Sequence, residues 1–167
     1  MRGLRHLAPA DLPRLQRFWI EHWAGDEMIV HGEVFRPEQL QGFVTEDWDG
    51  VVTYCIRSGE CEIISLDSLR EGRGIGTALI NAVIAEAREG GCSRVVLSTT
   101  NDNLRALGFY QRRGFALAQI RPGAMDESRK LKPGIPTIGM DGIPLRDEVQ
   151  LELKLCGSPR IASGRHR

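Results

Sequence analysis

Three glycines at alternate positions mark the turn from Gly72 to Thr77, which has the sequence Gly-Arg-Gly-Ile-Gly-Thr. The apolar run before the turn, Ile63 to Leu69, is typical of a strand, and the run after it, Thr77 to Glu89, is typical of a helix. Glycines let a backbone approach a ligand without interference from Cβ atoms. The unpaired N–H groups and the positive dipole end of the helix point into the turn. The pattern therefore predicts a phosphate cradle where a strand passes into a helix.

Two common phosphate-binding motifs do not fit this turn. A P-loop would place Lys and then Ser or Thr after its glycines, whereas Gly76 is followed by Thr77. The dinucleotide motif G-x-G-x-x-G fails from Gly72, because its sixth position is Thr77, and from Gly74, because its sixth position is Leu79. A tight turn without a ligand is the alternative, although glycines weaken a chain that does not need the space.

Apolar periodicity and turn residues predict one α+β domain within the 167 residues. The stretch from Asp26 to Gln41 has no clear apolar periodicity apart from a short helix signal at residues 37–40. Residues 135–144 contain several prolines and glycines and are expected to form an ordered loop. No linker divides the chain, so residues 1–157 are expected to form the domain and residues 158–167 a disordered tail. The expected strands are residues 4–7, 42–46, 51–57, 61–69, 94–100, 115–120 and 148–155, and the expected helices are residues 9–25, 77–89, 103–113 and 125–132.

Charge and cysteine content restrict the partners and the compartment. The 22 basic and 22 acidic residues balance, and a neutral chain lacks the basic footprint of most nucleic-acid-binding proteins. Cys55, Cys61, Cys92 and Cys156 form no C-x-x-C pair, which predicts free thiols and no metal site. Neither a signal peptide nor an apolar run of about 20 residues is recognisable. We therefore expect a cytoplasmic protein that binds neither nucleic acid nor membrane.

The segment from Glu62 to Phe115 resembles the GNAT superfamily of N-acetyltransferases. The first signature of that family, Arg/Gln-x-x-Gly-x-Gly/Ala, is matched at its glycines by Gly74 and Gly76, while Glu71 stands at the Arg/Gln position. The second signature, Asn-x-x-Ala-x-x-x-Tyr-x-x-x-Gly-Phe, is matched in full by Asn103, Ala106, Tyr110, Gly114 and Phe115. The two matches occur in the family's order, and together they form a specific pattern.

This resemblance implies a mixed, mostly antiparallel central sheet that is flanked by helices and whose strands splay apart at the CoA site. It implies acetyl-CoA as the donor, no metal, and direct attack by a primary amine of a small molecule or a protein in a ternary complex. GNAT proteins often form homodimers, so a homodimer is a further expectation. A carboxylate at Glu71 is unfavourable beside a pyrophosphate unless it turns away. The expected cofactor contacts are Leu69, Arg70, Gly72, Arg73, Gly74, Ile75, Gly76, Thr77 and Asn103.

Acyl transfer needs an uncharged amine, and an alkylamine of pKa about 10.4 is almost wholly protonated at neutral pH. A base is therefore useful. Glu62 occupies the strand position at which some family members keep a catalytic Glu, and an ordinary carboxylate on a solvated strand face is the alternative. Asp67, Glu33 and water alone are other possible bases.

Tyr110 lies seven residues after Asn103, where the family places the acid that protonates the leaving thiolate. Seven residues span about two helical turns, so the two side chains share one helix face. A core aromatic is the alternative. The resemblance also implies that a backbone N–H near Leu69 stabilises the oxyanion.

The amino-terminal segment is expected to shape the acceptor site. The candidates are Trp19, His22, Trp23, His31 and Glu33, although each residue type is more often found in a core or on a surface than at a ligand, and His22 is expected to pack on the apolar helix face. Three further candidates are Asn101, Asp102 and Asp147. Two other functions stay open, namely a non-catalytic acyl-CoA-binding regulatory module and a partner-binding domain that has lost CoA.

Overall fold

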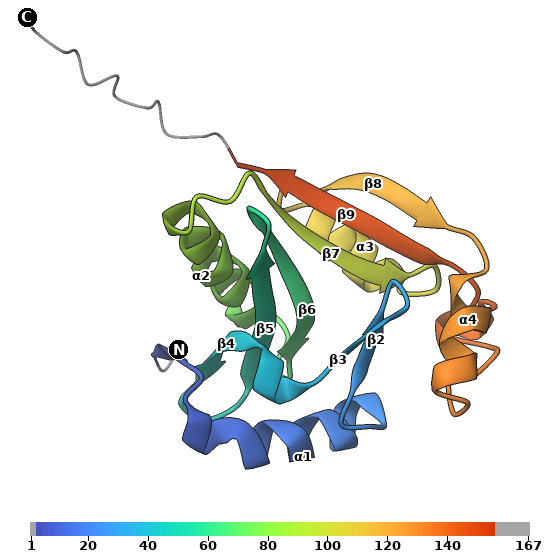
Figure 1. Cartoon of the computed structure of the whole chain (residues 1–167), viewed down its shortest axis with the longest axis horizontal. Coiled ribbons are helices and arrows are strands. Elements are labelled where there is room, and N and C mark those ends of the chain that lie inside the picture. Colours follow the sequence, from blue (N-terminus) through green and yellow to red (C-terminus); the bar gives the residue numbers. More distant parts are fainter. Residues whose placement is uncertain (1–2, 156–167) are drawn as a thin grey trace, which may run out of the picture.

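The computed structural model describes residues 3–155 and contains a seven-stranded sheet with helices on both faces (Figure 1). The strand order is β1-β4-β5-β6-β7-β9-β8, and only β6 and β7 run parallel. The predicted α+β fold with a mostly antiparallel sheet is confirmed. The strands of this sheet are β1 Leu4–His6, β4 Gln41–Thr45, β5 Gly50–Arg57, β6 Glu60–Ser68, β7 Arg94–Thr100, β8 Ala116–Arg121 and β9 Glu148–Lys154.

Four α-helices and three 3₁₀ turns accompany the sheet. The helices are α1 Leu12–Trp23, α2 Ile75–Glu89, α3 Leu104–Gln111 and α4 Ala124–Leu131, and the 3₁₀ turns are η1 Pro9–Asp11, η2 Pro37–Gln39 and η3 Met140–Gly142. The expected elements outside residues 26–36 agree with these bounds to within about three residues, the ordinary uncertainty of helix and strand ends. The expected tail at residues 158–167 lies outside the described residues.

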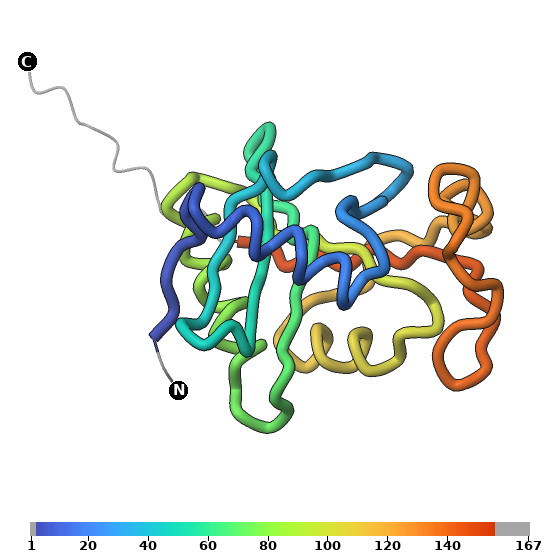
Figure 2. The backbone as a smooth tube through the Cα atoms, turned by 90° about the horizontal axis from the view of Figure 1, so that it is seen from below, coloured from blue at the N-terminus to red at the C-terminus, as the bar shows by residue number. Residues whose placement is uncertain are grey.

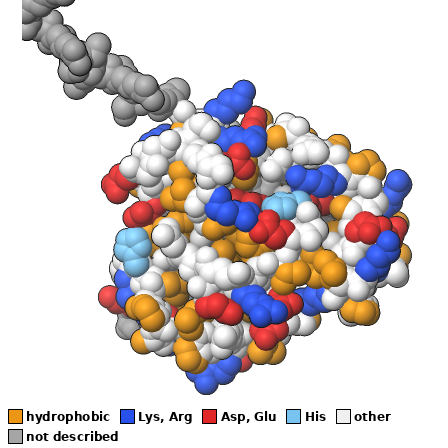
Figure 3. Space-filling model, viewed as in Figure 1, with side chains coloured by type: hydrophobic (Ala, Val, Ile, Leu, Met, Phe, Trp, Pro, Cys, Tyr) orange, Lys and Arg blue, Asp and Glu red, His pale blue; other side chains and the backbone are white. Residues whose placement is uncertain are grey.

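Each face of the sheet carries its own hydrophobic core, because successive side chains of a strand point to opposite faces. On one face, α2 and α3 pack against the sheet through residues such as Leu79, Val83 and Tyr110. On the other face, α1 and a small hairpin pack through residues such as Trp19 and Phe35. Figure 1 shows α1 along the bottom of the view, α2 to the left of β5, and α3 behind β7 and β9. Figure 3 shows acidic and basic side chains interspersed over the front face.

The hairpin comprises β2 Met28–Val30 and β3 Glu33–Phe35, within the stretch that had no clear period in the sequence. Its turn contains His31 and Gly32, whose φ angles of 42° and 79° lie in the left-handed region. Such angles suit a two-residue hairpin turn. Each strand is only three residues long, so the alternation is too short to predict.

Strand β6 pairs with its two neighbours over different lengths. It pairs with β5 along its whole length but with β7 only over Glu60–Ile63, although β7 continues to Thr100. The register against β5 shifts between Thr53 and Tyr54, which leaves Ile64 as an extra residue in β6. A bulge of this kind bends its strand. The second half of β6 therefore leaves β7, and the predicted splay is confirmed.

Candidate functional site

The glycine turn leads directly into α2, and its three glycines meet different local requirements. Gly72 and Gly74 have φ angles of 71° and 70°, and a Cβ added at either would meet no atom within 4 Å. A Cβ on Gly76, in contrast, would lie 2.9 Å from Cζ of Phe109. The first two glycines thus border open space, whereas the third permits close packing of α2 and α3.

The amino terminus of α2 is open to an anion. Gly74 is its N-cap, and no side chain caps it. The first intrahelical hydrogen bond runs from the Ala78 N–H to the Gly74 carbonyl at 3.0 Å, so the preceding N–H groups have no helical partner. Uncapped amides, open space and the positive end of the helix dipole fit the pyrophosphate that the sequence predicts.

Charged side chains around the turn are paired in ways that the sequence does not indicate. Nε of Arg70 lies 2.7 Å from Oδ2 of Asp49, and the Glu71 carboxylate turns to Arg105 of α3. The exposed 69–74 loop, light green in Figure 2, therefore contacts α3. Sequence reasoning missed Arg113, whose guanidinium donates to Oγ1 of Thr77 at 2.9 and 2.7 Å, in the first turn of α2. Its position three residues after Tyr110, just beyond the end of α3, was the available signal.

The free edge of β6 presents backbone N–H groups where β7 has left. The N–H of Leu69 donates to the carbonyl of Asp49 at 2.8 Å, on the β5 side. Successive N–H groups of a strand point to opposite edges, so those of Leu66 and Ser68 point to the β7 side. Leu69 therefore does not supply the N–H expected near it, and the groups facing the gap belong to Leu66 and Ser68.

Tyr110 is buried in α3 beside this gap. Its ring makes edge contacts with Phe109 and Phe115, at centroid distances of 5.2 and 5.7 Å. Burial, together with the nearby Asp67 carboxylate, raises the pKa of the Tyr110 hydroxyl. The phenol therefore keeps its proton at neutral pH. Asn103 caps α3, because its side chain accepts a hydrogen bond from the Ala106 N–H at 3.1 Å.

Asp67 lies on the second half of β6, where the strand has left β7. Both of its carboxylate oxygens accept from Nε1 of Trp23, the last residue of α1, at 3.1 Å. Burial raises the pKa of Asp67 to about 6, opposed by the Trp23 hydrogen bond and by the charge of His22. A carboxylate in this position is costly to ionise, which is typical of a functional site.

Asp67→Asn is expected to raise the free energy of unfolding above pH 6 by about 1–3 kcal/mol. The folded state binds an additional proton between the ordinary carboxyl pKa and about 6, so the wild type loses stability as pH rises through that window. Asparagine cannot ionise and can still accept from Trp23. Urea denaturation at pH 4.5 and 7.5 measures the difference, with the exposed Asp126→Asn as the control. Equal pH dependence in wild type and variant would refute the prediction.

Glu62 is buried rather than solvated, which corrects one of the two expectations for it. Its Oε1 lies 2.7 Å from Nε2 of His31 at the hairpin turn, and its Oε2 lies 3.7 Å from Arg57. Burial raises the pKa of Glu62, and His31 opposes that rise. The N–H of His31 also donates to Oε2 of buried Glu148 on β9 at 3.0 Å. Glu33 is bound by Arg57 at 2.7 and 3.0 Å.

The remaining predicted acceptor residues have structural contacts. Trp19 is fully buried in the core, while His22 is exposed, contrary to expectation, and lies against the Phe18 ring at a centroid distance of 4.2 Å. The side chains of the other three accept hydrogen bonds from backbone N–H groups within residues 122–147. Asn101 accepts from Arg146 and Asp147, Asp102 from Met140, and Asp147 from Gly123.

The expectations about a metal site, membrane-spanning helices and free thiols concern the whole chain, whereas the structure describes residues 3–155. Cys55, Cys61 and Cys92 are free, as predicted, and Cys156 lies outside the described residues. Within that range no group of three His, Cys, Asp or Glu side chains is arranged to hold a metal ion. None of the described helices has the length and apolarity needed to cross a membrane.

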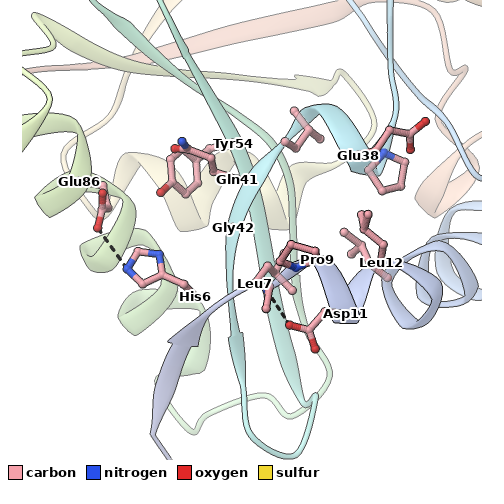
Figure 4. A pocket seen from close by; sticks show the side chains of 14 residues that line it. His6, Leu7, Pro9, Asp11, Leu12, Glu38, Gln41, Gly42, Tyr54 and Glu86 are labelled. Carbon is pink, nitrogen blue, oxygen red and sulfur yellow. Dashed lines mark hydrogen bonds and ion pairs between the residues drawn. The ribbon is translucent and has the colours of Figure 1, made fainter.

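A separate hollow of about 350 Å³ lies at the β1–β4 edge of the sheet (Figure 4). His6, Tyr54 and Glu86 border one side of β4, and Leu12 and Glu38 border the other. Strands β5 and β6 separate β4 from the gap beside β7. This hollow is therefore not part of the site formed by the glycine turn and the open edge of β6.

Comparison with known proteins identifies the family. The model of the acetyltransferase (GNAT) family matches residues 5–115. The chain is 45% identical over 139 residues to "Uncharacterized protein YdhI" of Bacillus subtilis (strain 168), which covers 81% of this chain and 87% of that protein.

The fold is also similar to those of solved acetyltransferases. The structure of a Bacillus subtilis acetyltransferase in complex with CoA has a TM-score of 0.65 and 20% identity, covering 92% of this chain and 100% of that one. The ribosomal-protein-S18-alanine N-acetyltransferase of Escherichia coli has a TM-score of 0.66 and 18% identity, covering 98% and 100%. The family match, the splayed sheet and the uncapped glycine turn agree, and the chain belongs to the acetyltransferase (GNAT) family.

Proposed function

We propose that this protein transfers the acetyl group of acetyl-CoA to a primary amine of a small molecule or a protein, with both substrates bound together. The observation that carries the proposal is the junction between the open edge of β6 and the uncapped start of α2. An extended thioester with a pyrophosphate fits such a junction, because one end needs strand-like pairing and the other needs amide donors.

The cofactor contacts follow from this junction. The backbone from Gly72 to Thr77, including Gly74, Ile75 and Gly76, holds the pyrophosphate, and Arg73 and Arg113 supply positive charge. Arg70 joins them when it exchanges Asp49 for the phosphate. The half-exposed Leu69 side chain and the free amide nitrogen of Asn103 contact the pantetheine arm. These assignments include no metal.

The chemistry requires three proton transfers. The ammonium first gives one proton to Glu62 through bridging water, which leaves a neutral amine. The amine nitrogen then bonds to the thioester carbon while the N–H groups of Leu66 and Ser68 hold the carbonyl oxygen as its negative charge develops. The carbon–sulfur bond breaks, Tyr110 gives its proton to the departing sulfur and regains one from water, and the nitrogen gives its second proton to water as the amide forms.

Glu62→Gln is expected to lower kcat by about 100-fold or more, with little change in acetyl-CoA affinity. Glutamine keeps the contact with His31 but cannot accept a proton. Thiol release over a range of pH measures the loss, and Glu33→Gln is the matched control because that carboxylate is bound by Arg57. An undiminished kcat would remove Glu62 from the mechanism.

Two measurements test the proposed function itself. Thermal shift with acetyl-CoA reports binding, and thiol release with a panel of amines reports transfer. Stabilisation with release supports the proposal, whereas stabilisation without release supports a non-catalytic acyl-CoA-binding regulatory module. Absence of both would contradict the proposal. A cytoplasmic location and a homodimer stay predictions.

A further inference from the structure

Asp67 is a poorly exposed carboxylate that forms no ion pair within the described residues, although the charge of His22 acts on it. Its hydrogen bonds come from the neutral Trp23 indole, and no arginine or lysine of residues 3–155 forms an ion pair with it. Buried Glu62 and Glu148 have cationic partners, His31 and Arg57 for Glu62 and Arg121 for Glu148. Buried Asp102 has none, but it accepts hydrogen bonds from the Thr100 hydroxyl and the Met140 N–H. An uncompensated charge away from water is costly, so a bound cation would stabilise the ionised form of Asp67.

The position of Asp67 places it beside the proposed transfer centre. It stands between Leu66 and Ser68, whose N–H groups face the gap, and its carboxylate is directed to α1. Tyr110 of α3 is close enough for the Asp67 charge to raise its pKa. Trp23 and Leu69 are 40% and 48% exposed, so apolar surface borders the carboxylate.

We propose that Asp67 binds the acceptor's ammonium group next to the apolar surface of Trp23. The inference rests on the proposed function and names its substrate class: alkylamines that are cationic at neutral pH, with an apolar body, rather than arylamines that are uncharged. Asp67 orients the nitrogen toward the N–H groups of Leu66 and Ser68. Its effect is therefore on the recognition of the amine.

The decisive experiment compares benzylamine with aniline at pH 7.5 in the full chain. Isothermal titration in the presence of CoA measures binding, and thiol release from acetyl-CoA measures KM and kcat. Asp67→Asn is expected to weaken benzylamine binding by about 10- to 100-fold and to leave aniline binding and acetyl-CoA affinity unchanged. Asp67→Glu should recover part of the preference for benzylamine over aniline. The variant Glu127→Gln, at an exposed position, should behave as wild type.

The pH dependence provides a second readout. Benzylamine binding should weaken as pH falls through about 6, because the carboxylate becomes protonated, and Asp67→Asn should lose this dependence. His22 of α1 and Tyr110 of α3 are the other titratable groups that face Asp67. His22→Gln should therefore keep the dependence on pH.

The outcomes separate this inference from the proposed function. If the wild type releases thiol but Asp67→Asn binds benzylamine as tightly as the wild type does, the inference fails and the proposed function stands. If no amine causes thiol release, the proposed function fails, but isothermal titration still tests whether Asp67 binds benzylamine. Equal binding of benzylamine and aniline by the wild type would also overturn the inference.

Discussion

Tyr110→Phe should lower the rate of acetyl transfer by about 100-fold or more while leaving the affinity for acetyl-CoA nearly unchanged. The substitution keeps the aromatic ring between Phe109 and Phe115 and removes only the hydroxyl. Because burial raises the pKa of that hydroxyl, the wild-type phenol carries its proton at every pH at which the amine reacts. Its loss leaves the departing sulfur without a donor from the protein.

Thiol release measures kcat for this variant, and thermal shift measures its binding of acetyl-CoA. Tyr54→Phe is the matched control, because Tyr54 is also a buried tyrosine and lines the distant β1–β4 hollow. It should retain wild-type turnover. Undiminished turnover in Tyr110→Phe would mean that the thiolate departs unprotonated or takes its proton from water.

Gly74→Ala should lower the stability of the protein and also raise the dissociation constant for acetyl-CoA by about 10- to 100-fold. The φ angle of 70° at Gly74 is strained for any residue with a Cβ. That Cβ would also enter the open space before the uncapped end of α2, where the pyrophosphate is proposed to lie. Binding by isothermal titration measures the loss.

Gly59→Ala separates the two effects. Gly59 has a φ angle of 72°, a Cβ there would also meet no atom within 4 Å, and the residue lies in the turn between β5 and β6. This control should lose stability as Gly74→Ala does but bind acetyl-CoA normally. Equal affinity in both variants would show that the open space at Gly74 is not the binding site.

The features that the sequence predicted correctly depend on local patterns. Apolar periodicity and the glycines located β6, the turn and α2, and the downstream motif located α3. Tyr110 of α3 is buried, as the core-aromatic alternative predicted. The mostly antiparallel sheet and its splay followed from the family resemblance, whereas the order of its strands was not predicted. These features repeat over several residues or carry an unusual residue type, which is why one sequence is enough to predict them.

The features that it did not predict depend on contacts between distant segments. The hairpin β2–β3 consists of strands too short for a periodic signal, and its turn is held by His31 against Glu62 and Glu148. The exposure of His22 and the direction of the Leu69 N–H also follow from neighbours far away in the chain. No local pattern encodes such pairings.

The extra residue in β6, Ile64, lets Glu62 and Asp67 share one face of the sheet. In a regular strand, residues five apart point to opposite faces, so Glu62 and Asp67 would be separated by the sheet. The bulge at Ile64 reverses the alternation, and both acids meet partners from the same face, the hairpin and α1. The extra residue therefore bends β6 without separating the two acids. Deleting Ile64 would leave Glu62 and Asp67 four residues apart and still on one face, but it would remove the bulge that bends β6 away from β7.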